Sequence, residues 1–155
     1  MIEQYQQAAA AGGESAFSAP RPYGLTLGHK HVPEMMAHTG LSMRPIFMPI
    51  VSSFYKGLAV SVPLNLRELG TTPEALHAAY TRHYAGERFV RVMPLRDAAT
   101  LESGFFDVQA DNDTNFADIF VFGSEDQALV LARLDNLGKG ASGAAVQNLK
   151  LMLGL

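Results

Sequence analysis

Residues 117–137, ADIFVFGSEDQALVLARLDNL, predict the centre of the fold. Two runs rich in β-branched, aromatic and other apolar residues flank the turn-forming tetrapeptide Gly-Ser-Glu-Asp. This pattern is typical of two strands joined by a short connection. We therefore expect an adjacent pair of strands here, with the rest of the chain built around it.

Further strands and helices are predicted on both sides of this pair. The stretch TTPEALHAAYTRHY gives the clearest helix, because Thr71 or Thr72 can cap it and Pro73 suits its first turn. GASGAAVQNLKLMLG predicts a second amphipathic helix near the end of the chain. Short strands are expected over residues 23–27, 45–51, 57–64 and 88–95, and the spacing of 45–51 and 57–64 suits a hairpin or a sheet crossing.

Strands outnumber long helices in this pattern, and short turns connect most of them. We therefore predict an α+β fold in which helices pack on one face of a mixed, mostly antiparallel sheet. The boundaries we expect are a flexible lead-in over residues 1–20, an α+β domain over 21–137 and a terminal helical arm over 138–155. Gly12 and Gly13 interrupt the lead-in, where a frayed helix is expected before them.

Composition excludes several classes of protein. Of the 155 residues, 48% are hydrophobic and 17% are charged, which is typical of a globular chain. The formal net charge of −3 makes nucleic acid and an anionic membrane surface unexpected partners. The chain has no cysteine and no apolar run of the ~18 residues that a membrane span requires. We expect a cytoplasmic protein whose own residues supply neither a disulfide nor a thiol nucleophile.

The stretch GHKHVPEM, residues 28–35, is the main candidate site. On an extended backbone, His29 and His31 would lie on the same face while Lys30 points away. Pro33 and Glu34 suit the first turn of a helix that ends at Gly40, and the Glu34 carboxylate could orient one imidazole. From these residues alone, a helix-capping role, an acid–base site and a metal site all remain open.

Two metal-binding patterns fit poorly. A cupin metal site also has H-x-H followed by glutamate, but it needs one more residue before the glutamate and a second motif downstream, so we predict no metal. The DNDTN stretch, residues 111–115, opens like a calcium loop, yet Phe116 and Phe122 occupy the positions of the required glycine and glutamate. A solvated turn leading into the strand that follows is the better interpretation.

Basic residues and small residues supply two further candidate groups. Lys56, which precedes Gly57, and the arginines Arg21 and Arg44 are candidates for binding an anion, but the residues alone favour an exposed surface role for each. At the start of the last predicted helix, a run of glycine and alanine would let the backbone approach a cofactor, a phosphate or a second domain. Tight packing within this domain is the alternative.

Two of these stretches together resemble one enzyme family. GHKHVPEM resembles the G-H-(R/K)-H-x-P-E motif of N-acetyl-γ-glutamyl-phosphate reductases, and LDNLGKGASGAAVQN resembles the D-N-L-x-K-G-A-x-G-x-A-V-Q-N motif that closes them. PIFMPIVSSFYKGLAVSVPL and TNFADIFVFG match strands that lie between these motifs. Aspartate-semialdehyde dehydrogenases share a version of the closing motif, so a fragment of such a reductase is an alternative, but the H-x-H-x-P-E stretch separates the two families.

The resemblance implies the C-terminal catalytic and dimerisation domain of such a reductase, with a glyceraldehyde-3-phosphate-dehydrogenase-like C-terminal fold. The family's G-x-G-x-x-G dinucleotide-binding domain and its cysteine in N-P-G-C-Y-P-T have no counterpart in this sequence. The whole enzyme is expected to reduce an acyl phosphate to an aldehyde with NADPH, in arginine biosynthesis. The isolated chain is then expected to be inactive, to need the missing cofactor domain and to form a homo-oligomer. A non-catalytic dimerisation module is the competing hypothesis.

The resemblance also implies roles for individual residues. His29 is expected to be the acid–base group, with His31 as its companion in orienting the substrate. Glu34 would orient an imidazole, and the Tyr23 hydroxyl could reach the same pocket. Lys56, Arg21 and Arg44 would meet the substrate's phosphate or carboxylate, and Gly140, Ala141 and Ser142 would lie beside the nicotinamide of NADP.

Overall fold

The fold is described from a computed structural model, which describes residues 2–11 and 19–155. The chain divides into two compact units, residues 1–55 and 56–155. This division falls inside the range 21–137 that we expected to form one domain. Each unit is described by itself below. Gly12 and Gly13, where a flexible break was expected, lie outside the described residues.

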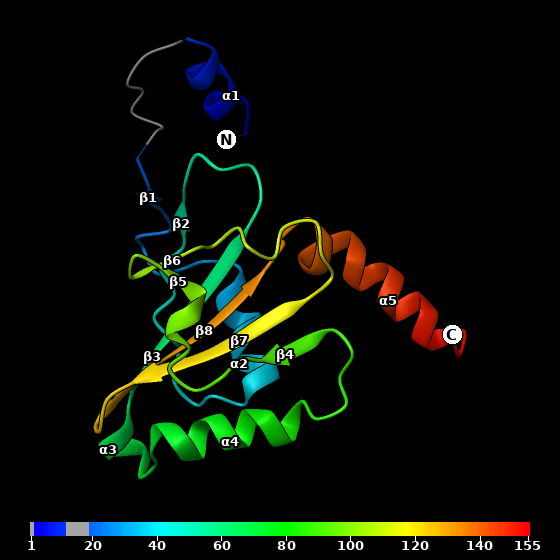
Figure 1. Ribbon diagram of the computed structural model, residues 1–155. Coiled ribbons are helices and arrows are strands. Elements are labelled where there is room, and N and C mark those ends of the chain that lie inside the picture. Colours follow the sequence, from blue (N-terminus) through cyan, green and yellow to red (C-terminus); the bar gives the residue numbers. More distant parts are fainter. Residues whose placement is uncertain (1, 12–18) are drawn as a thin grey trace. The chain divides into compact units, whose positions relative to one another are not determined.

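The first unit contains short elements joined by irregular segments (Figure 1). Helix α1 spans Ile2–Ala10, which agrees with the helix expected before the two glycines. Strand β1, Arg21–Pro22, pairs in antiparallel fashion with strand β2, Ile50–Val51. Helix α2 spans His31–Thr39.

Helix α2 begins and ends as the sequence predicted. Pro33 and Glu34 lie in its first turn, and Gly40 ends it with a left-handed φ of 68°. The amide of Gly40 donates to the carbonyl of Met36 at 3.0 Å, which satisfies one of the last carbonyl groups of the helix.

Two predictions for the first unit are wrong. Residues 23–27 form a turn instead of a strand: the Leu27 amide donates to the Gly24 carbonyl at 2.9 Å, and Leu27 itself has a φ of 57°. In the predicted strand 45–51, only Ile50–Val51 is paired, and its partner is β1 and not the strand that follows. The proposed hairpin between 45–51 and 57–64 is therefore absent from the described residues.

The second unit is built on a four-stranded sheet with the order β3-β8-β7-β4 (Figure 1). The strands are β3, Leu58–Asn65, β4, Val90–Val92, β7, Ala117–Gly123, and β8, Gln127–Leu134. Strand β8 is antiparallel to both β3 and β7, whereas β4 is parallel to β7. The predicted α+β class with a mixed, mostly antiparallel sheet is confirmed.

The β7–β8 hairpin forms the core of the unit, as residues 117–137 predicted. It carries the most buried apolar side chains of the sheet, and the consecutive residues Phe120 and Val121 are both fully buried, so side chains on both faces of β7 are covered. In register, Phe120 faces Leu131 and Val121 faces Val130. These opposed pairs place large apolar side chains next to one another in the centre of the sheet.

Strand β3 forms one edge of this sheet, since β8 is its only strand partner among the described residues. Pro63 lies within β3, and proline is tolerated in an edge strand because it has no amide hydrogen for a ladder. Leu58, Val60 and Val62 recur at every second position and are each 40–45% exposed.

Two helices connect β3 to β4. Helix α3, Leu66–Leu69, begins at Asn65, whose side chain accepts the amides of Arg67 and Glu68. Helix α4, Pro73–His83, packs against β7 and β4, which confirms the expected contact with the sheet. Thr72 caps α4 by accepting the Ala75 amide at 3.1 Å, as predicted.

Between β4 and β7 the chain makes an excursion that the sequence analysis did not predict. It contains a 3₁₀ turn, η1, Ala98–Thr100, and a short hairpin of β5, Leu101–Glu102, and β6, Phe105–Phe106. The Phe106 ring meets the Phe120 ring edge-on, with centroids 5.1 Å apart. The excursion thus contributes to the core from one face of the sheet.

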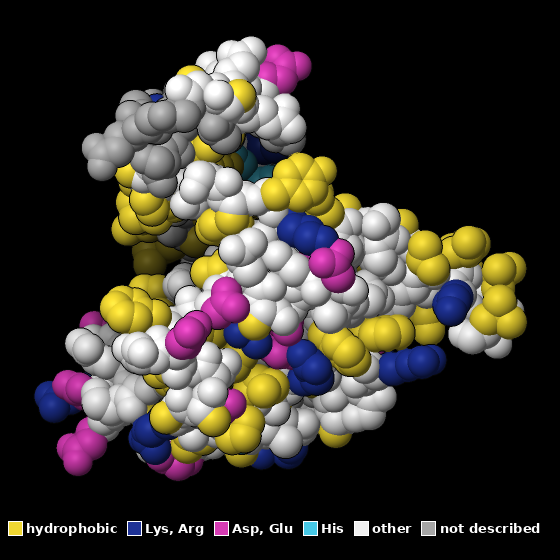
Figure 2. Space-filling view, turned by 45° about the horizontal axis from the view of Figure 1, so that its top comes forward, with side chains coloured by type: hydrophobic (Ala, Val, Ile, Leu, Met, Phe, Trp, Pro, Cys, Tyr) yellow, Lys and Arg dark blue, Asp and Glu magenta, His cyan; other side chains and the backbone are white. Residues whose placement is uncertain are grey.

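The chain ends in a π-helical turn, η2, Gly138–Ser142, followed by helix α5, Gly143–Met152. The helix projects from the end of β8 (Figure 1), and hydrophobic side chains lie along it among white backbone and polar atoms in the space-filling view (Figure 2). Val146, Leu149 and Leu151 are between 54% and 69% exposed. Across the described part of the chain, every helix is too short or too polar to span a bilayer.

Candidate functional site

The histidine cluster occupies the junction between a turn and α2. His29 precedes the helix and His31 is its first residue. Lys30 between them adopts a right-handed helical conformation, with φ of −56° and ψ of −27°, so the expected extended backbone is wrong. The two imidazole rings nevertheless lie together, with centroids 4.9 Å apart, because the turn brings them to one side.

Glu34 lies one helical turn beyond His31 and accepts a hydrogen bond from its ring. His31 Nδ1 and Glu34 Oε2 are 2.8 Å apart. The hydrogen bond from His31, together with its nearby charge, holds the pKa of Glu34 below its ordinary value. Because the carboxylate is an acceptor, His31 carries a proton on Nδ1, which leaves the Nε2 lone pair of the neutral ring free to accept another.

His29 has a different hydrogen-bond arrangement. Its Nδ1 accepts the backbone amide of His31 at 3.3 Å, so the neutral ring carries its proton on Nε2. In the neutral rings the Nε2 atoms therefore differ: Nε2 of His31 can accept a hydrogen bond, whereas Nε2 of His29 can donate one.

Aromatic rings and a glycine fix the orientation of His29. The Phe47 ring lies edge-on to it with centroids 5.1 Å apart, and the Tyr23 ring lies 5.8 Å away. A Cβ atom on Gly24 would lie 3.6 Å from the His29 ring. Tyr23 is held by its amide, which donates to the Pro49 carbonyl at 2.9 Å. The structure thus brings Tyr23, His29, His31 and Glu34 together.

The three basic candidates have different surroundings. Arg44 donates from Nη2 to the Leu27 carbonyl at 3.2 Å, so it braces the turn that precedes His29. Arg21 is an exposed residue of β1. Lys56 forms an ion pair with Asp113, and its side chain is only 25% exposed. A surface lysine at the start of a strand, which was one interpretation of the sequence, does not describe Lys56.

The backbone around Lys56 is anchored by side chains of the second unit. Gln109 and Asn112 donate to the Lys56 carbonyl at 3.2 and 3.0 Å. The Gly57 amide donates to Asn136 Oδ1 at 2.8 Å. Gly57 has a φ of 120° and a hypothetical Cβ would lie 3.0 Å from the Val108 carbonyl, so the close approach requires glycine.

Asp135 organises the start of η2. Its carboxylate accepts the amides of Asp113 and Leu137, both at 2.8 Å, and of Gly138 at 3.0 Å. These backbone hydrogen bonds, first that from Asp113, lower the pKa of Asp135. The Asp-Asn pair of the closing motif therefore joins three segments: the start of β3, the 111–115 turn and η2.

Gly140, Ala141 and Ser142 lie in η2 and are exposed. The Gly140 amide donates to the Asp135 carbonyl at 2.8 Å, and the Ser142 hydroxyl donates to the Leu137 carbonyl at 2.9 Å. A π-helical turn leaves an unusual, wide backbone loop, often found at functional sites.

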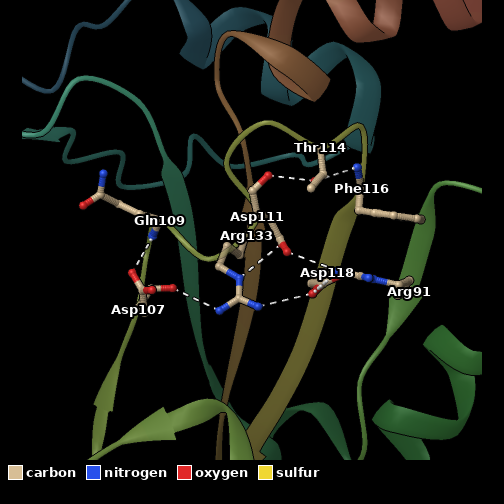
Figure 3. A network of polar contacts seen from close by, with 8 residues as sticks. All are labelled: Arg91, Asp107, Gln109, Asp111, Thr114, Phe116, Asp118 and Arg133. Atoms are coloured by element: carbon tan, nitrogen blue, oxygen red, sulfur yellow. Dashed lines mark hydrogen bonds and ion pairs between the residues drawn. The ribbon is translucent and has the colours of Figure 1, made fainter.

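A buried ionic network that the sequence analysis missed lies on the sheet (Figure 3). Arg133 of β8 contacts Asp111 at 3.1 Å and Asp118 of β7 at 3.3 Å. Arg91 of β4 donates to Asp118 from two nitrogens, at 2.6 and 2.8 Å, and contacts Asp111 at 3.1 Å. Arg133 also donates to the Asp107 carbonyl at 3.0 Å.

The network corrects the prediction of a solvated turn over residues 111–115. Asp111 is 2% exposed, because its carboxylate reaches into the sheet to meet both arginines. Burial, followed by the nearby charge of Asp118, raises the pKa of Asp111. The signal was present in the sequence, since Asp118 and Arg133 interrupt two otherwise apolar strands and face each other in register.

A grouping of three or more histidine or acidic side chains able to hold a metal ion is absent from residues 2–11 and 19–155.

One family model matches most of the chain. It is described as semialdehyde dehydrogenase, dimerisation domain, and it covers residues 7–136. Both the histidine cluster and the β7–β8 hairpin lie inside the matched range, whereas η2 and α5 lie outside it.

Curated relatives are similar over a comparable range. N-acetyl-gamma-glutamyl-phosphate reductase 2 of a Nostoc species is 52% identical over 86% of this chain and 43% of its own length. The N-acetyl-gamma-glutamyl-phosphate reductases of Burkholderia cenocepacia and Brucella ovis are 49% and 52% identical over 96% and 85% of this chain. The chain therefore spans about half the length, or less, of these relatives.

Proposed function

Because this chain belongs to the semialdehyde dehydrogenase dimerisation-domain family, we propose that it forms part of an N-acetyl-γ-glutamyl-phosphate reductase. In this proposal the whole enzyme reduces an acyl phosphate to a semialdehyde with NADPH and releases phosphate. The chain supplies the acid–base histidines and the dimer contact. A separate domain supplies the nucleophilic cysteine and most of the cofactor site. The His31–Glu34 hydrogen bond is the observation that carries the catalytic part.

The geometry favours His31 over His29 as the acid–base group, which reverses the assignment made from the sequence. The Glu34 carboxylate orients His31 through Nδ1, and this leaves Nε2 free to take a proton. His29 already uses Nδ1 to accept the His31 amide, so its outward atom is an N–H donor. We therefore assign proton transfer to His31 and substrate orientation to His29, with Phe47 and Tyr23 holding the His29 ring.

The proposed chemistry uses His31 in each proton transfer. Its Nε2 first takes the thiol proton of the cysteine, so that the thiolate can attack the acyl carbon and displace phosphate. When bound, NADPH supplies a hydride to that carbon. The His31 imidazolium then protonates the oxygen that hydride transfer leaves negatively charged, which gives a thiohemiacetal on the cysteine. When its C–S bond breaks, the hydroxyl proton passes back to His31, the aldehyde leaves and the cysteine is again a thiolate. Glu34 stabilises the imidazolium form of His31.

Basic residues are proposed to bind the substrate's anionic groups. Arg44 lies in the same unit as the histidines, next to the turn that carries them, and is joined in this role by Arg21. Lys56 can take part only by exchanging its ion pair with Asp113 for one with the substrate. For the cofactor, Gly140, Ala141 and Ser142 are proposed as the contact with the nicotinamide end of NADP.

Complementation with a cofactor domain tests this function. The chain would be co-expressed with the part of the Nostoc relative that it does not cover, and phosphate-dependent reduction of NADP by the semialdehyde would be measured. We expect activity only in the mixture, with neither turnover nor appreciable NADPH binding by the 155-residue chain alone. Turnover by the isolated chain would refute the division of labour. A well-formed complex with no activity would favour a non-catalytic dimerisation module.

Histidine variants then separate the two assignments. In an active complex, His31→Ala should lower kcat by about 10²–10⁴-fold, because general acid–base catalysis contributes this much. His29→Gln should act mainly on KM, and His38→Asn, at the far end of α2, is the matched control. A larger loss of kcat from His29→Gln than from His31→Ala would return the acid–base role to His29.

A further inference from the structure

The ion pair between Lys56 and Asp113 joins a fixed cation to an exposed counter-ion. The backbone of Lys56 is fixed because its carbonyl accepts hydrogen bonds from Gln109 and Asn112. The exposed fractions of the two paired side chains differ: 25% for Lys56 and 79% for Asp113. The Lys56 side chain therefore lies largely within the surface, and the carboxylate that faces its ammonium lies mostly in water.

The buried network on the sheet shows a different arrangement of charges. The side chains of Asp111 and Asp118 are 3% and 1% exposed, and each contacts two guanidiniums. Separating such a pair would leave a buried charge without compensation. An exposed pair is weaker, since water solvates a carboxylate that leaves it. Another anion can therefore displace Asp113 from Lys56 at little cost, whereas Asp111 and Asp118 stay with their arginines.

A second carboxylate near Lys56, that of Asp135, is held in place. Its oxygens accept three backbone amides, those of Asp113, Leu137 and Gly138. These hydrogen bonds, first that from Asp113, lower the pKa of Asp135, and the charge of Lys56 contributes to the same shift. Because Asp135 is tied to the backbone, Asp113 is the carboxylate that an incoming anion would replace.

We propose that the Asp113 carboxylate competes with phosphate for Lys56 and so sets the affinity of the chain for a phosphate dianion. The proposal rests on the proposed function only where it identifies this dianion with the phosphoryl group of the substrate. Phosphate binds only to the fraction of molecules in which Asp113 has left Lys56, so its apparent dissociation constant is raised. In the whole enzyme, the return of Asp113 to Lys56 would favour release of the phosphate product.

Titration of the 155-residue chain with inorganic phosphate at constant ionic strength tests the proposal. The NMR shifts of the Lys56 and Gly57 amides report binding. Asp113→Asn should lower the dissociation constant about three- to tenfold, because the variant removes both the competing ion pair and a negative charge next to the dianion. Asparagine also tolerates the left-handed φ of 64° at this position, so the turn is kept. Adding Lys56→Gln to Asp113→Asn should abolish the gain.

Asp126→Asn is the matched control, because Asp126 forms another exposed ion pair, with Arg67, and the variant changes the net charge equally. It should leave the phosphate dissociation constant at the wild-type value. Acetate, titrated in parallel, stands for the carboxylate groups of the substrate and should bind Asp113→Asn more weakly than phosphate does.

Three results would overturn the proposal: equal phosphate binding, or none, in wild type and Asp113→Asn; the same gain from Asp126→Asn; or acetate binding as tightly as phosphate. Turnover is not measured in these titrations. An inactive complex with the cofactor domain would therefore refute the proposed catalysis and leave the phosphate result standing, and an active complex would not rescue a failed titration.

Discussion

At the scale of single residues, two carboxylate–cation pairs differ sharply in surroundings. Asp118 is 1% exposed and contacts two guanidiniums, one of which belongs to the buried Arg133. Asp126 instead contacts Arg67 at 3.6 Å on the surface. The Asp118 contacts lie in the core, where removing one partner leaves a buried charge that destabilises the fold. The attraction between Asp126 and Arg67 is weakened by the surrounding water.

We therefore predict that Asp118→Ala lowers the free energy of unfolding by about 3–5 kcal/mol, because it leaves Arg133 with less compensation in a buried position. Asp126→Ala, as the matched control, should cost less than about 1 kcal/mol. Urea denaturation at neutral pH measures both. Equal losses from the two variants would show that the buried network does not stabilise the sheet.

The histidine cluster and the buried ionic network show which contacts between residues the sequence could predict and which it could not. The proximity of His29, His31 and Glu34 was predicted, but for the wrong backbone, since Lys30 is helical and not extended. Asp118 and Arg133 interrupt apolar strands, but spacing along the chain does not identify their partners, which come from neighbouring strands and from the 111–115 turn. A contact fixed by tertiary register cannot be obtained from spacing along the chain.

At the scale of elements, locally encoded structure was predictable. Thr72 and Pro73 set the start of α4, and the turn residues between β7 and β8 set the hairpin. The strand predicted over residues 23–27 is absent because Leu27 adopts a left-handed φ, which leucine rarely takes and which a strand does not allow. The predicted strand over 45–49 joins no sheet within residues 2–11 and 19–155, although the Pro49 carbonyl accepts the Tyr23 amide next to the β1–β2 pair.

Asp135 gives a prediction for the element η2. An Asp135→Asn variant keeps one oxygen for the Leu137 and Gly138 amides but loses the acceptor for the Asp113 amide. We expect it to lower the free energy of unfolding by about 1–3 kcal/mol at pH 7, since a buried donor loses its partner.

The pH dependence of this loss follows from the lowered pKa of Asp135. A depressed pKa gives stability that is present above the unfolded value, about 3.9, and is lost as pH falls through the folded value. The difference between wild type and Asp135→Asn should therefore shrink from about pH 7 to about pH 3. Urea denaturation at both pH values checks this, and a constant difference would contradict it.

At the scale of the whole molecule, α5 presents apolar surface outside the range matched by the dimerisation family. We propose that it packs on the cofactor domain. A variant with Leu149→Glu and Leu151→Glu should weaken binding to a separately expressed cofactor domain at least about thirtyfold, as measured by calorimetry. Its Tm should stay at the wild-type value, because both side chains are more than half exposed. Asn148→Ala is the control, and unchanged affinity in the double variant would place the contact elsewhere.

Pro63 has a consequence for how the protein behaves at high concentration. An edge strand of eight residues offers a template on which further strands can add without limit, and that growth leads to fibrils. A proline in this edge removes one of the amide hydrogens that such a ladder would need. Pro63 thus opposes edge-to-edge polymerisation of the sheet, and Pro63→Val would remove that protection.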